Sequence, residues 1–141
     1  MIVSGICNSY KTEILQGIHL VTHDYYIALF TDSAVLSKDT TTYIGALNEV
    51  SNGNGYTTGG KLLENISIVL DNDTAILDFE TDPLWTASTI TARGALIYNS
   101  SLVGKNAIGV LNFGIDYSSN NGDFKIQFPL PTDSTALLRI T

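Results

Sequence analysis

Charged side chains are scarce in this sequence. They make up 15% of its 141 residues, against roughly 25% in ordinary soluble domains, and the chain carries 16 Thr, 12 Ser and 11 Asn. Small neutral polar groups cost less to desolvate than charged groups, and Lys, Glu and Asp are depleted at protein interfaces. The composition is therefore consistent with a surface made for protein neighbours, although a strand-rich chain with many Asn and Ser turns would show it too.

Basic residues are the scarcer of the two charged classes. There are seven against 14 acidic residues, which gives a formal net charge of −7. Phosphate binding needs clustered Lys and Arg, and an anionic membrane surface repels an acidic chain. We therefore expect neither a nucleic-acid partner nor a membrane partner. The basic residues are scattered along the chain: Lys11, Lys38, Lys61, Arg93, Lys105, Lys125 and Arg139.

Cysteine is nearly absent, since Cys7 stands alone. No intramolecular disulfide and no cysteine-based metal site can be built from one cysteine. The neighbouring Gly5, Ile6 and Asn8 supply no base, so we expect a buried, inert thiol. We expect no signal peptide, because the first residues do not place a basic segment before a long apolar run. No run reaches 18 apolar residues, and we expect a protein made in the cytosol.

The length fits one domain, residues 1–141, in which residues 1–22 form an N-terminal arm and helix. Only residues 9–19 show apolar positions at the spacing of a helix. Asn8 or Ser9 is expected to cap the start of this helix. The helix has no supporting ion pair, so we expect it to depend on packing against a sheet.

The rest of the chain contains two kinds of segment. Runs that are apolar, or that alternate between apolar and polar residues, predict strands, and clusters of Asn, Asp, Gly and Pro between them predict turns. The turns at Asp71–Asp73 and Asn120–Asp123 are each expected to close a tight β-hairpin. The spacing predicts a mainly-β fold, an antiparallel sandwich of about eight strands that is jelly-roll-like or Ig-like. The predicted strands cover residues 25–31, 43–51, 66–70, 74–79, 89–98, 106–113, 124–128 and 136–140, with loops at 32–42 and 51–60.

Five acidic residues lie close together in the sequence. Asp78, Glu80 and Asp82 alternate, so in an extended strand their carboxylates would project from one face. Together with Asp71 and Asp73 they supply enough oxygens for Ca²⁺, but the spacing is not that of a helix-loop-helix calcium loop. Nothing fixes the carboxylate separation that glycoside hydrolysis requires. A solvated strand face or a charged edge is the simpler explanation.

Two histidines, His19 and His23, stand four residues apart. A helix would bring such a pair to one face, where the pair can bind zinc. The sequence has no HExxH glutamate, and polar residues around His23 indicate that the helix has already ended. We therefore interpret both as ordinary polar residues near a helix end, and assign no catalytic, cofactor-binding or metal-binding residue to the chain.

Several other side chains have two possible roles. Arg93 lies in an apolar strand and must be paired if it is buried; we favour a partner within the domain, such as an acidic residue near 78–82, over an interface. Trp85 is expected to fill the core. Three loop tyrosines could stack on sugars in a carbohydrate-binding module, although packing is the simpler role: Tyr43, Tyr56 and Tyr117.

Six segments carry a resemblance that covers nearly the whole chain: CNSYKTEILQGIH (7–19), YYIALFT (25–31), NEVSNGNGYTTGG (48–60), TARGALIYNSS (91–101), AIGVLNFGIDYSSNNGDFKIQFP (107–129) and TALLRI (135–140). In this order they resemble a group of small proteins from the structural gene blocks of tailed bacteriophages. That group has no catalytic motif to carry over. The resemblance implies a non-enzymatic virion protein, assembled in the host cytoplasm.

The position of such a protein in the particle is open. The leading expectation is a capsid decoration or cement protein that binds the major capsid protein or other virion proteins. A homo-oligomer is expected, for example a trimer at local three-fold positions. The alternatives are a tail, neck or fibre-attachment component and, from a different class, a carbohydrate-binding module. No cofactor is expected in any of these roles.

Overall fold

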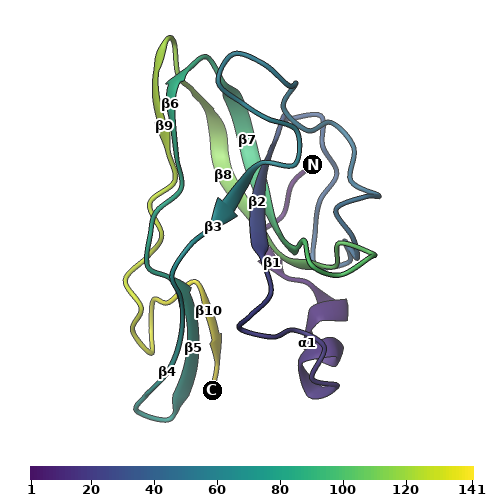
Figure 1. Ribbon diagram of the computed structural model, residues 1–141, viewed down its shortest axis with the longest axis vertical. Coiled ribbons are helices and arrows are strands. Elements are labelled where there is room, and N and C mark those ends of the chain that lie inside the picture. Colours follow the sequence, from purple (N-terminus) through teal and green to yellow (C-terminus); the bar gives the residue numbers. More distant parts are fainter.

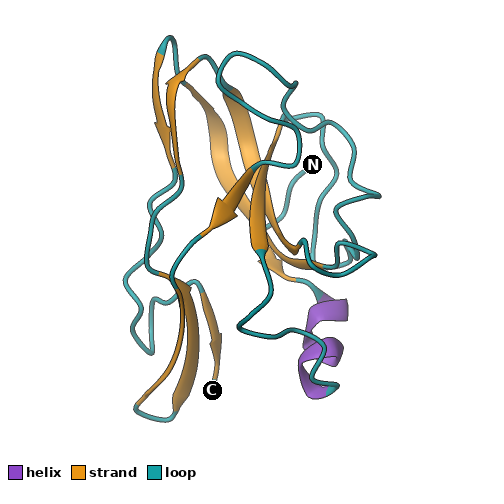
Figure 2. Ribbon diagram, viewed as in Figure 1, coloured by secondary structure: helices purple, strands orange, loops and turns teal.

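The computed structural model describes residues 1–141. It confirms a mainly-β fold, with 45% strand and 6% helix and ten strands in place of about eight (Figures 1 and 2). The elements in chain order are β1 (Gly5–Ile6), α1 (Asn8–Leu15), β2 (Tyr25–Phe30), β3 (Lys61–Leu63), β4 (Ile66–Asp71), β5 (Thr74–Phe79), β6 (Leu84–Ser88), β7 (Thr91–Asn99), β8 (Ala107–Ser118), β9 (Gly122–Lys125) and β10 (Leu138–Ile140).

Three antiparallel sheets build the fold. The largest has the strand order β1-β8-β7-β2-β3, and the others have the orders β10-β5-β4 and β6-β9. The central strands β2 and β7 are buried along almost their whole length, which explains why both are continuous apolar runs. In Figure 1 the β6-β9 pair lies beside the large sheet and the β10-β5-β4 sheet extends below it, so the arrangement is sandwich-like.

A single long ribbon connects two of these sheets. Thr91 of β7 lies opposite Ser118 of β8, and Ser88 of β6 lies opposite Gly122 of β9, so the pairing continues from one sheet into the other. The prediction that Asn120–Asp123 closes a tight hairpin is therefore wrong, because β8 and β9 do not pair with each other. The turn residues form a corner at which the whole ribbon bends.

Small hydroxyl side chains hold this corner. Ser88 Oγ lies 2.8 Å from Ser119 Oγ and donates to the Gly122 carbonyl at 3.0 Å. Ser119 Oγ in turn accepts a hydrogen bond from the Ile90 N–H at 3.1 Å. The bend interrupts the regular ladder, and these hydroxyls bond backbone groups that would otherwise be buried without a partner. The other predicted hairpin, at Asp71–Asp73, is confirmed by the pairing of β4 with β5.

The helix differs from its prediction at both ends. It begins at Asn8 and ends at Leu15, short of residue 19, and its N-cap is Cys7, which makes no capping hydrogen bond with its side chain. The expectation that Asn8 or Ser9 caps the helix is therefore wrong. The sequence pattern was misread because the apolar spacing continues past the end of the helix.

Gly17 explains where the helix stops. Its φ angle is +68°, and the N–H groups of Gly17 and Ile18 donate to the carbonyls of Ile14 and Glu13, each at 3.1 Å. This pattern is the Schellman motif, in which a left-handed glycine ends a helix. The motif reverses the chain, so that the segment from Ile18 onward runs back past the helix.

The hydrophobic core extends from Ile2 to Leu138. Trp85 is 3% exposed and packs edge-on against Phe124 with 6.0 Å between ring centroids. Lys61 Nζ lies 5.6 Å from the centre of the tryptophan ring. The prediction that Trp85 fills the core is thus confirmed. None of the helical structure is long and apolar enough to cross a membrane.

Gly60→Ala tests how closely the 51–60 loop packs on β2. Gly60 has a φ of +82°, and a Cβ there would overlap the Ile27 carbonyl, so the variant is expected to lose about 3 kcal/mol of unfolding free energy. Gly17→Ala is the matched control, because Gly17 also has a positive φ but open space around it; its cost should be about 1 kcal/mol. Urea denaturation measures both, and equal losses would contradict the close packing.

Candidate functional site

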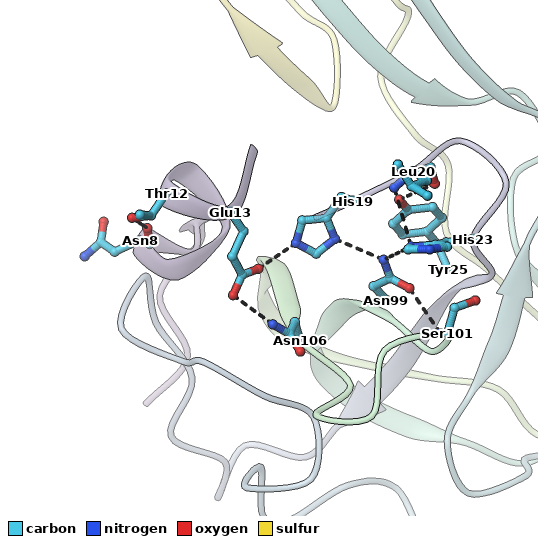
Figure 3. Close-up of polar contacts among 10 residues, drawn as sticks. All are labelled: Asn8, Thr12, Glu13, His19, Leu20, His23, Tyr25, Asn99, Ser101 and Asn106. Atoms are coloured by element: carbon cyan, nitrogen blue, oxygen red, sulfur yellow. Dashed lines mark hydrogen bonds and ion pairs between the residues drawn. The ribbon is translucent and has the colours of Figure 1, made fainter. Parts of the chain in front are cut away.

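The two histidines meet in a polar network beside the helix (Figure 3). Asn99, which is fully buried at the end of β7, places its Nδ2 atom 3.0 Å from His19 Nδ1 and 2.8 Å from His23 Nδ1. His19 Nε2 lies 2.6 Å from Glu13 Oε2. Asn106 Nδ2 donates to the other oxygen of Glu13 at 2.8 Å. The network joins α1 and the segment after it to the β7–β8 hairpin.

The hydrogen bonds favour one tautomer of both rings. Asn99 Oδ1 accepts from the Ser101 N–H at 3.1 Å, so the Asn99 amide nitrogen must point at the histidines. Because this nitrogen donates, each histidine Nδ1 must accept, and each proton sits on Nε2. His19 Nε2–H then donates to Glu13. Both donors of the Asn99 amide are used, and the Leu20 N–H also donates to His23 Nδ1, at 3.4 Å.

A network of this kind holds structure together. No group of three or more His, Cys, Asp or Glu side chains is placed to hold a metal ion. The sequence showed the two histidines but gave no sign of Asn99 and Asn106, which are about 80 residues or more from them. Gly17 was the one available signal, because the Schellman turn brings His19 back to Glu13.

The five acidic residues do not form a cluster on one strand face. β5 ends at Phe79, so Glu80 and Asp82 lie beyond the strand, and the expected alternation is wrong. Asp82 accepts from the Phe128 N–H at 2.9 Å and lies 3.5 Å from Lys125. Asp71 accepts from the Asp133 N–H at 2.8 Å. Each of these carboxylates has a separate structural partner.

Asp78 is the exception among them, because it is 6% exposed and its Oδ1 atom has no hydrogen-bond partner. Burial raises the pKa of the Asp78 carboxyl above its usual value of 3.8. A hydrogen bond from the Phe79 backbone N–H lowers this pKa in part, and the nearby carboxylates of Asp82 and Glu80 raise it. A buried carboxylate without full compensation costs stability when it is charged.

Two of the three candidate sugar-binding tyrosines belong to a buried network. Tyr43 and Tyr56 each donate from the hydroxyl to Glu49 at 2.7 Å, and the Gly59 N–H donates to the same carboxylate at 2.7 Å. Desolvation and the bond to Glu49 raise the pKa of both hydroxyls above the usual value. Only Tyr117, which is 52% exposed, remains available to a ligand.

Arg93 and Cys7 are also placed by the structure. Arg93 Nε donates to Asp116 Oδ1 at 2.7 Å, and both side chains are partly exposed. The preference for a partner within the domain is confirmed, whereas the expected partner near 78–82 is wrong. Cys7 is fully buried, which confirms the expected burial, and burial raises the pKa of its thiol to about 11, which favours the unreactive thiol form.

The β10-β5-β4 sheet has one face made only of apolar side chains, which we call the apolar face. The pairing register places eight residues on it. Its inner end is buried against the core, whereas Ile68, Leu70 and Ile140 at its outer end are 55%, 74% and 57% exposed. The members of the apolar face are Ile66, Ile68, Leu70, Ala75, Leu77, Phe79, Leu138 and Ile140.

The chain itself covers part of the opposite face of this sheet. Asp133 bonds to Asp71 through its N–H and to Asn72 through its carboxylate, which fastens the segment before β10 to the β4–β5 hairpin. Ile76 on that face is 1% exposed and Ala136 in the segment is 7% exposed, whereas Val69 on the same face is 48% exposed. The apolar face is the more exposed of the two, because three of its large side chains each expose more than half of their surface.

The networks around Asn99 and Glu49 are thus bonded within the chain, whereas the outer half of the apolar face is exposed. Comparison of the chain with protein-family models, with curated proteins and with solved structures finds no match. The function must therefore be inferred from the sequence and from the surfaces of the chain.

The protonation of the histidines can be measured directly. We expect long-range ¹⁵N NMR spectra to show the proton of each neutral ring, in His19 and in His23, on Nε2, because Asn99 donates to both Nδ1 atoms. In Asn99→Leu, His23 Nδ1 keeps only the 3.4 Å bond from the Leu20 N–H, so the Nε2 tautomer of His23 should lose population relative to the wild-type chain. A proton on Nδ1 of either ring in the wild-type chain would contradict the network.

Asp78→Asn should stabilise the chain at neutral pH. Because the folded-state pKa of Asp78 is raised, the favourable protonated form is fully present below the unfolded pKa and is lost as pH rises through the folded pKa. We expect a gain of about 1 kcal/mol in unfolding free energy at pH 7, shrinking toward zero below about pH 4.

Glu80→Gln is the matched control for this substitution. Glu80 is exposed, so removing its charge should change the unfolding free energy by less than about 0.5 kcal/mol. Urea denaturation at both pH values measures the two variants. A loss of stability in Asp78→Asn at pH 7 would show that the carboxylate is compensated in the folded chain.

Proposed function

We propose that the chain is a non-enzymatic structural protein of a tailed-bacteriophage virion, a decoration or cement protein that binds the outer capsid shell. The observation that carries this proposal is the apolar face, whose outer half has no cover in the chain. Contiguous exposed apolar surface on a soluble protein marks an interaction site. The resemblance of six sequence segments to phage structural proteins supplies the setting.

The energetics favour a protein neighbour for this face. Fully burying a Leu or Ile side chain contributes about 1.5–3 kcal/mol, and Ile68, Leu70 and Ile140 each expose more than half of their surface. None of the eight residues of the apolar face is polar. A partner can therefore cover it without desolvating a charge, which is the expensive step in forming an interface.

The edge of the same sheet supports this interpretation. β4 has no neighbour on its outer side, and its sequence ISIVLD contains no Lys, no Pro and no bulge. Free sheet edges usually carry such features because an unprotected edge pairs with other chains. An edge that a neighbouring protein covers in an assembly does not need these features, so the unprotected edge of β4 is consistent with a chain that is packed against other proteins in a particle.

The position of the β4–β5 hairpin in the molecule also suits docking to a protein partner. In Figure 1 the β10-β5-β4 sheet lies at the lower end of the molecule, with the chain terminus beside β10 and the large sheet above. A homo-oligomer, for example a trimer at a local three-fold position, would turn several such sheets toward the shell. The major capsid protein is then the partner.

A re-binding experiment on particles tests this function. Virions of a phage that encodes the chain, prepared without it, are mixed with the purified wild-type chain, with Leu70→Lys and with Val103→Lys. The wild-type chain should co-sediment saturably with the capsids. Leu70→Lys should bind about tenfold more weakly, because one large apolar contact is replaced by a charge.

Val103→Lys is the matched control, because Val103 is 99% exposed and lies outside the β10-β5-β4 sheet. It should bind like the wild-type chain. Negative-stain images of gold-labelled chain should place it over the capsid surface. Label confined to the tail would contradict the capsid position in favour of a tail or neck component, and no binding to any part of the particle would contradict the virion role.

A further inference from the structure

A second surface feature lies far from the apolar face, at the corner of the bent ribbon. A groove of about 420 Å³ runs between the outer half of β8 and strand β9 with the residues after it. Phe113 and Tyr117 line it on the β8 side, with 6.2 Å between their ring centroids in an edge-to-face arrangement. Phe124 and Ile126, which are 6% and 8% exposed, lie on the β9 side. The volume is within the range of ligand sites.

The two strands that border the groove differ in their pairing. β9 pairs with β6 alone, so one of its edges is free. β8 pairs with β7 at Asn112 and again at Tyr117, and between these pairs the register shifts, so Phe113–Asp116 bulge out of the ladder. The groove thus lies between the free edge of β9 and a bulged stretch of β8.

The groove follows the edge of β9 and does not cross one face of it. Five successive residues, 123–127, line the groove, and successive residues of a strand point to opposite faces. The Ile126 N–H donates to the Pro83 carbonyl at 3.0 Å, so alternate residues turn their backbone groups toward β6. By this alternation Asp123 and Lys125 turn theirs away from β6, toward the groove.

The charged residues on this edge of β9 limit which kind of strand could bind there. Asp123 makes no ion pair or side-chain hydrogen bond, and the Lys125 ammonium has a partner, Asp82, only at 3.5 Å. In an antiparallel pair, directly opposite side chains are neighbours, and opposite charges stabilise the pair. A strand with an acidic residue opposite Lys125 and a basic residue opposite Asp123 would complement both.

We propose that this groove binds an extended polypeptide segment, which adds to β9 as an antiparallel strand. The segment reads acidic, apolar, basic at the three positions opposite Lys125, Phe124 and Asp123. Its backbone bonds the free edge of β9, and its larger apolar side chains contact Phe113 and Tyr117. Strand addition is a common mode of peptide recognition, in which the backbone supplies affinity and alternate side chains supply specificity.

A designed peptide provides the test: acetyl-Thr-Val-Glu-Val-Lys-Val-Thr-amide. Its binding to the full chain is measured by ¹⁵N–¹H NMR titration up to about 1 mM. We expect saturable shifts at Asp123–Gln127. N-methylation of the Glu and Lys nitrogens, which face β9 in this register, should abolish binding, whereas N-methylation of the two flanking Val nitrogens, which point away from β9, should leave it intact.

A charge exchange tests the register. Asp123→Lys should bind the peptide about fivefold more weakly and should recover affinity for the peptide in which Glu replaces Lys. Asp73→Lys, a charge change at the exposed tip of the β4–β5 hairpin, is the matched control and should bind like the wild-type chain.

Three results would overturn the proposal. The first is no saturable shift with the designed peptide, and the second is binding that survives N-methylation of the Glu and Lys nitrogens. The third is saturable binding of cellohexaose, maltohexaose or chitohexaose that Tyr117→Ala abolishes, because the groove would then be a sugar site with Tyr117 as its platform.

Discussion

The pairing of one long bent ribbon is the constraint on which the rest of the structure depends. β6 and β7 pair with β9 and β8 on either side of the corner at Ser88 and Ser119, with register shifts between Trp85 and Ser88 and between Ala92 and Gly94. The bend brings Trp85 and Phe124 into the core. It also determines which strand edges lack a neighbour. β2 pairs with the outer edge of β7, whereas the outer half of β8 and all of β9 have no strand beside their outer edge. The groove at the corner follows from this arrangement.

The buried polar side chains of the chain also have a structural role. Glu13, Glu49 and Asn99 each bond two or more neighbours and fasten loops to the large sheet, so the buried polar side chains are used for structure. What remains for function is surface: the apolar face of the β10-β5-β4 sheet and the edge of β9. Both are suited to protein contacts, and the low charge of the sequence lowers the desolvation cost of forming them.

Local patterns in the sequence predicted the parts of the fold that depend on local chemistry. The run YYIALF and the turn at Asp71–Asp73 have the expected structure. Phe124, Ile126 and Phe128 are buried as expected, although the strand predicted over 124–128 ends at Lys125. The turn at Asn120–Asp123 failed, because a hairpin and a ribbon corner use the same turn residues and differ only in long-range pairing. The His19–Asn99 contact spans 80 residues, and no local pattern reveals it. The exposure of the outer half of the apolar face could not be predicted either. An alternating pattern predicts that one strand face is buried, but it does not show whether the same chain or another chain covers that face.

Hydroxyl-radical footprinting tests most directly the claim that another protein covers the apolar face. Side-chain oxidation of Leu70, Ile140 and Val103 is compared by mass spectrometry in the free chain and in the assembled particle. All three are exposed in the free chain and should be oxidised there. In the particle, Leu70 and Ile140 should be protected while Val103 remains reactive. Equal oxidation of Leu70 and Ile140 in the two states would contradict the account.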